Sequence, residues 1–135
     1  MLAGSRVTIQ KQARKSLLPM SSKLFVACCL FVLGQTLAWF QTNSQFVWTW
    51  WEDKPLITVA LFAIPTGLCF WFGVKLAYEA MGGVVWGPRF LIFSMSYLTF
   101  PILTWHFLGE SMFTTKTMIC VFLSMIIVGV QLFWR

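Results

Sequence analysis

The sequence predicts an all-α integral membrane protein, a four-transmembrane-helix bundle with both termini in the cytoplasm. Of its 135 residues, 59% are hydrophobic and only 10% are charged, which is typical of a chain solvated by lipid. Long charge-free runs each suffice to cross a hydrocarbon core of about 30 Å as a helix of about 20 residues. These runs lack the alternation of polar and apolar residues that barrel strands require.

The transmembrane domain is expected at residues 23–135, with spans at about 24–41, 55–78, 89–109 and 116–134. The segment QTNSQ gives the first span a polar exit, and the tryptophans that follow it suit the headgroup level. Pro55 suits the first turn of the second span. The segment MGGVVWGPR cannot hold a regular helix, so it predicts the turn into the third span.

The third span is expected to stop at a helix-end motif formed by Gly109 and Glu110. A glycine accepts the left-handed conformation that ends a helix, and a carboxylate at the membrane surface costs little. Thr114 or Thr115 is the expected cap of the fourth span. On the second span, Lys75 and Glu79 lie one turn apart and are expected to form a solvated pair.

The positions of the basic residues predict the orientation. Eight of the ten Lys and Arg lie before the first span, in the second connection or at the end of the chain, and two lie in the other connections. The positive-inside rule therefore places both termini in the cytoplasm. We ascribe the net charge of +6 to this sidedness, and no nucleic acid partner is expected.

Residues 1–22 are basic and contain no acid. We interpret them as a cytoplasmic tail, although an organelle-targeting segment has the same composition. The membrane is accordingly expected to be a bacterial-type inner membrane, with an organellar membrane as the alternative.

Few residues are suited to catalysis. The chain has one histidine, and its four acids all fall at predicted span ends. Hydrolytic and metal-dependent sites need several converging polar groups, so no enzyme activity is expected. No two cysteines have the spacing of a zinc or redox pair, and neither metal nor cofactor is expected.

Polar residues inside the predicted spans suggest a solute groove. Ser94, Tyr97 and Thr104 follow helical spacing on one stripe of the third span, which Pro101 interrupts. Gln35 lies near the middle of the first span, where an amide needs a partner or water. Together they predict a substrate-binding groove; hydrogen-bonded contacts between helices are the alternative for each.

The fourth span presents mostly small residues at helical spacing: Thr117, Cys120, Ser124 and Val128. Small faces let helix backbones approach closely in lipid. This face is expected to serve an oligomer or to pack within the monomer.

Short segments resemble one known family. The stretches VLGQTLAWF, KLAY, FLGESM and Met118 to Arg135 are similar, in this order, to the small multidrug resistance proteins of the drug/metabolite transporter superfamily. The resemblance covers about 100 residues from Val32 onward. It implies a four-helix membrane protein that transports small molecules.

The chain departs from that family in two respects. Phe31 stands where the resemblance places the first-helix carboxylate that couples transport to protons, so that coupling is not expected. The uneven charge distribution also opposes an antiparallel dimer, because each copy would need to insert either way. A parallel homodimer or a hetero-oligomer in the lipid bilayer is expected instead.

Two functions follow from these observations. The first is a small transporter, or transporter subunit, for a weakly polar solute. The alternative, favoured by the aromatic load of eight Trp and fourteen Phe, is a non-transporting structural or accessory subunit of a membrane complex.

Overall fold

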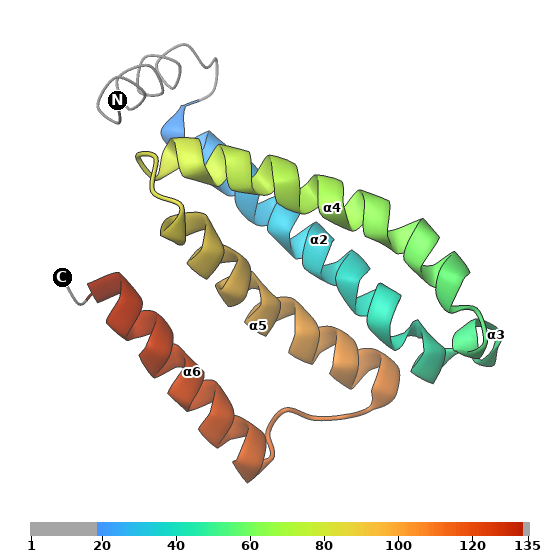
Figure 1. Cartoon of the computed structure of the whole chain (residues 1–135). Coiled ribbons are helices and arrows are strands. Elements are labelled where there is room, and N and C mark those ends of the chain that lie inside the picture. Colours follow the sequence, from blue (N-terminus) through green and yellow to red (C-terminus); the bar gives the residue numbers. More distant parts are fainter. Residues whose placement is uncertain (1–18, 134–135) are drawn as a thin grey trace.

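The computed structural model describes residues 19–133, excluding the side chains at positions 128, 129 and 131–133. Within this range the chain forms helices and no strand: α2 (Met20–Val47), α3 (Thr49–Glu52), α4 (Pro55–Ala80), α5 (Trp86–Leu108) and α6 (Thr115–Phe133). Helix α2 packs against both α4 and α5, whereas α6 lies beside α5 without packing closely against the other helices (Figure 1). Residues 1–18 of the expected tail lie outside the described part.

Three of the helices, α2, α4 and α5, are long and apolar enough to cross a membrane, and α6 contributes a shorter apolar stretch, Thr115–Ile127. Large apolar side chains cover the outer faces of the bundle; Leu56 is 83% exposed and Ile64 is 69% exposed. Such a surface is unfavourable in water and favourable in lipid. The chain is therefore a multi-pass membrane protein.

Two helices extend beyond the expected spans for identifiable reasons. The segment expected to end the first span continues α2 to Val47, because the side chains of Thr42, Asn43 and Gln45 hydrogen-bond to carbonyl oxygens of the helix itself. Helix α5 begins at Trp86 rather than residue 89, so that Pro88 lies within its first turn. Gly82 and Gly83, both at positive φ, make the turn before it.

The centre of the bundle is a reciprocal contact between two phenylalanines and two glycines, here called the Phe–Gly interlock. The Phe31 ring of α2 packs on Gly73 of α4, and the Phe70 ring of α4 packs on Gly34 of α2. A Cβ atom added at Gly73 would lie 2.6 Å from the Phe31 ring, and one added at Gly34 would lie 2.9 Å from the Phe70 ring. Both glycines are therefore required for α2 and α4 to approach this closely.

The solvated pair expected between Lys75 and Glu79 does not form. Glu79 instead accepts a hydrogen bond from the Lys23 ammonium of α2 at 2.8 Å, and the Lys75 ammonium lies 5.5 Å from the centre of the Trp71 ring. Lys23 is buried and lies beside the carboxyl end of α4, where the helix dipole favours a cation. Tertiary packing thus outweighs the local i, i+4 spacing.

At the opposite end of the bundle, aromatic side chains connect three helices. The buried Trp39 of α2 donates its indole N–H to the Thr104 hydroxyl of α5 at 3.0 Å. The Phe40 ring lies 6.2 Å from the Phe62 ring of α4 and 5.4 Å from the Phe107 ring of α5, measured between centroids. These contacts hold α2 between its neighbours at this end.

The Phe–Gly interlock predicts opposite effects of one substitution at two glycines of α4. Gly73→Ala should lower the melting temperature in detergent, because its methyl group meets a buried ring and overpacking costs about 1–3 kcal/mol. Gly67→Ala is the matched control, since nothing lies within 4 Å of its added Cβ and alanine favours a helix over glycine by about 1 kcal/mol. Equal shifts in the two variants would contradict the interlock.

Candidate functional site

Helices α5 and α6 and the segment between them enclose a pocket of about 370 Å³, here called the α5–α6 pocket. Its polar lining consists of Ser96, Tyr97, Thr104, Glu110, Ser111 and Thr117. Its apolar walls are Phe93, Phe100, Pro101, Met112 and Val121. A mainly apolar pocket of this volume with a few polar groups suits a small molecule.

Helical spacing gathers the α5 side of the pocket on one face. Phe93, Tyr97, Phe100 and Thr104 recur at intervals of three and four residues, so their side chains point in one direction. Pro101 lies inside the helix and has no N–H, so the Tyr97 carbonyl lacks its usual donor one turn later. That carbonyl is an additional acceptor beside the pocket.

The polar groups of the pocket differ in whether hydrogen bonds within the protein already use their donors and acceptors. The Thr104 oxygen accepts the indole N–H of Trp39, which leaves its own O–H free to donate. Ser96 donates to the Phe93 carbonyl at 2.8 Å. Tyr97 packs its ring edge-on against Phe93, and no hydrogen bond to its hydroxyl occurs within residues 19–133. Thr104 and Tyr97 are therefore the groups best placed to bind a solute.

The connection to α6 begins with the expected pair. Gly109 follows α5 with a φ of 69°, and its N–H bonds back to the Trp105 carbonyl, so the helix ends here. Glu110 is exposed and also lines the α5–α6 pocket. Thr114 accepts a hydrogen bond from the Thr117 N–H and caps α6.

The other two residues of the expected groove lie elsewhere. Gln35 donates to the Ile92 carbonyl of α5 at 3.4 Å, a contact between two helices. Ser94 donates to the Phe90 carbonyl of its own helix at 3.0 Å. Neither residue lines the α5–α6 pocket, so the structure brings Tyr97 and Thr104 together without Gln35 and Ser94.

The residues of the small face expected on α6 do not all have the same surroundings. Thr117 faces the pocket, and its hydroxyl lies 2.8 Å from that of Thr114. Cys120 is exposed, and Ser124 donates to the Cys120 carbonyl. The Val128 side chain lies outside the described part. Of the α6 side chains that the structure describes, none is buried.

Sequence reasoning missed Ser96, Ser111 and Thr117 as lining residues. Ser96 follows Phe93 by three residues, so centring the stripe on Phe93 instead of Ser94 would have included it. Ser111 and Thr117 carry no comparable signal, because only the approach of the connection and α6 to α5 brings them into the pocket.

The described residues hold no group of three or more His, Cys, Asp and Glu suited to a metal ion. His106 is exposed, and its ring packs edge-on against Phe107. Comparisons of the chain with protein-family models, curated proteins and solved structures found no match.

Proposed function

We propose that the chain is a small transporter, or transporter subunit, of the drug/metabolite type, with α6 as a fourth span and both termini in the cytoplasm. The α5–α6 pocket is its solute site. The observation that carries this proposal is the presence of Tyr97 and Thr104, with free hydrogen-bonding capacity, among apolar walls beside two helices that do not pack tightly.

The chemistry of the pocket favours a weakly polar solute. A solute bound there meets the Tyr97 hydroxyl, the Thr104 hydroxyl and the Tyr97 carbonyl, each of which makes one directional hydrogen bond. Phenylalanine rings and Met112 make up most of the remaining surface and suit an apolar body. Glu110 is the one residue charged at neutral pH that lines the pocket within the described part.

Coupling of transport to protons through the first helix is not part of this proposal. Phe31 occupies the corresponding position and is fully buried in the Phe–Gly interlock. Within the described part of the chain, the charged side chains lie near the ends of the helices or in the connections, where a charge costs little free energy. Movement of the solute down its own gradient needs no titratable group at membrane depth.

Filling the α5–α6 pocket should abolish solute uptake into proteoliposomes, screened with uncharged solutes that carry one or two hydroxyl or amide groups. Val121→Trp places an indole in the pocket, and Ile119→Trp, on an exposed position of the same helix, is the matched control. Tyr97→Phe should weaken binding about fivefold, the value of one hydrogen bond of about 1 kcal/mol. If neither Val121→Trp nor Tyr97→Phe changes uptake, the α5–α6 pocket is not the solute site.

A second candidate function, an accessory subunit of a larger membrane complex, is favoured by the exposure of α6. Phe122 is 67% exposed and Ile127 is 63% exposed, and the other described side chains of α6 are exposed or partly exposed. Helices associate in lipid through close packing, which α6 lacks against the other helices that the structure describes. Cys120 and Ser124, the two described residues of the small face that do not line the α5–α6 pocket, are the ones proposed to meet a partner.

The mass of the complex extracted in mild detergent separates the two functions. A transporter that assembles as a parallel homodimer should run at twice 15.5 kDa after correction for detergent. Ser124→Phe should shift that species to the monomer, because a bulky ring prevents close approach. Copurification of a larger chain in fixed proportion would support the accessory role instead.

A further inference from the structure

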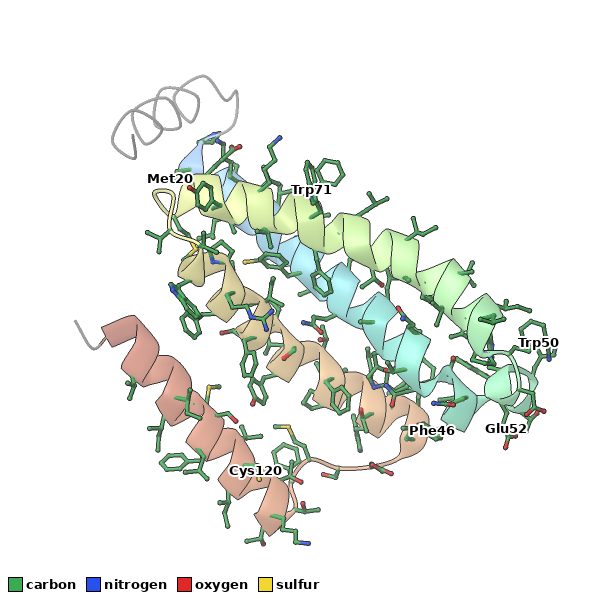
Figure 2. All side chains as sticks on the ribbon, in the orientation of Figure 1. Met20, Phe46, Trp50, Glu52, Trp71 and Cys120 are labelled. Carbon is green, nitrogen blue, oxygen red and sulfur yellow. The ribbon has the colours of Figure 1, made fainter. Side chains whose placement is uncertain are left out.

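A second pocket, of about 620 Å³, lies at the end of the bundle that contains α3. Figure 2 shows this end, marked by Trp50 and Glu52, opposite the end that carries Met20. We call this second pocket the aromatic pocket. The residues that form its walls are Leu37, Phe40, Trp48, Trp50, Trp51 and Phe62. The Phe40 ring stacks with the Trp48 ring and with the Phe62 ring, at an interplanar angle of 19° in each pair. Rings so held present a rigid apolar surface.

One polar side chain lines the aromatic pocket and has no partner. Ser44 is 1% exposed, and its hydroxyl makes no hydrogen bond within the described part of the chain. A buried hydroxyl without a partner is unfavourable, so an occupant with an acceptor oxygen would stabilise the site. A purely apolar occupant would leave this hydroxyl unsatisfied.

The depth of Ser44 in the membrane indicates which kind of acceptor its hydroxyl would meet. Helix α2 rises about 31 Å from Lys23 to Ser44 at about 1.5 Å per residue, close to the thickness of a hydrocarbon core. With Lys23 at one interface, Ser44 therefore lies at the other. Tryptophan rings favour the same level, and the ester carbonyls of phospholipids lie there.

The charged residues next to the pocket complement a zwitterionic headgroup. Trp50 and Trp51 continue directly into Glu52, Asp53 and Lys54. The Lys54 ammonium lies 2.7 Å from the Trp50 carbonyl oxygen and 4.2 Å from the centre of its ring, which holds a positive charge beside the pocket. Glu52 and Asp53 are exposed and supply two negative charges. This pattern favours a headgroup that carries both signs over a purely anionic one.

We propose that the aromatic pocket binds one zwitterionic phospholipid. Its acyl chain lies along Leu37, Phe40 and Phe62, and an ester carbonyl accepts the Ser44 hydroxyl. The phosphate faces Lys54, and the ammonium faces the carboxylates of Glu52 and Asp53. The lipid fills the groove between α2 and α4 at their α3 end.

Native mass spectrometry of the full chain, released from nanodiscs that contain equal amounts of phosphatidylethanolamine and phosphatidylglycerol, tests this proposal. The unmodified chain should retain one phosphatidylethanolamine. Ser44→Ala should lower the retained fraction about fivefold, the value of one hydrogen bond of about 1 kcal/mol. Thr42→Ala, which removes an exposed hydroxyl bonded to the Ala38 carbonyl of the same helix, should leave it unchanged.

Ser44→Thr and Ser44→Val introduce side chains of nearly equal size, of which only threonine carries a hydroxyl. Only the threonine variant should therefore retain the lipid. Retention of phosphatidylglycerol to the same extent, retention of no lipid, or equal losses in Ser44→Ala and Thr42→Ala would overturn the proposal. The first two results concern the unmodified chain, so they decide the matter even where a variant does not fold. The α5–α6 pocket is separate, and its solute site does not depend on this result.

Discussion

The Phe–Gly interlock is the contact on which the rest of the bundle depends. Lipid tails are as apolar as the side chains of α2 and α4, so burial alone does not bring these helices together. Shape complementarity does, because each phenylalanine ring occupies the space that the facing glycine leaves open. The arrangement is antiparallel, and the same spacing, a Phe followed by a Gly three residues later, recurs at Phe31–Gly34 and Phe70–Gly73. The small cluster around Phe31, with Ala27 and Ala77, forms the buried core.

Once α2 is held against α4, it positions α5 and both pockets. Gln35 bonds to the backbone of α5, and Trp39 bonds to the hydroxyl of Thr104, whose residue lines the α5–α6 pocket. On another side, Phe40 packs against Phe62 and lines the aromatic pocket. A single helix thus connects the proposed solute site with the proposed lipid site. Helix α6 is outside this network, which leaves its side chains for lipid, for solute or for a partner.

Local signals in the sequence predicted the features that depend on local chemistry. Gly109 ends α5, Thr114 caps α6 and Pro55 begins α4, because each of these residues restricts or satisfies its own backbone. Features that depend on packing were not predicted. Glu79 pairs with Lys23, 56 residues away, and Ser44 became notable only through its burial among rings from three segments. Of the stripe expected on α5, Tyr97 and Thr104 line the α5–α6 pocket, whereas Ser94 does not, and Ser96 lines it without having been predicted.

Cross-linking of α2 to α4 in the membrane tests the interlock most directly. In a chain whose native cysteines are replaced by alanine, Ala27→Cys combined with Ala77→Cys places two thiols in the buried core beside Phe31. A short bifunctional thiol reagent should join them within the monomer. Ala27→Cys combined with Ala60→Cys, an exposed position near the other end of α4, should give no such product. A cross-link in the second pair, or none in the first, would contradict the antiparallel packing of α2 on α4.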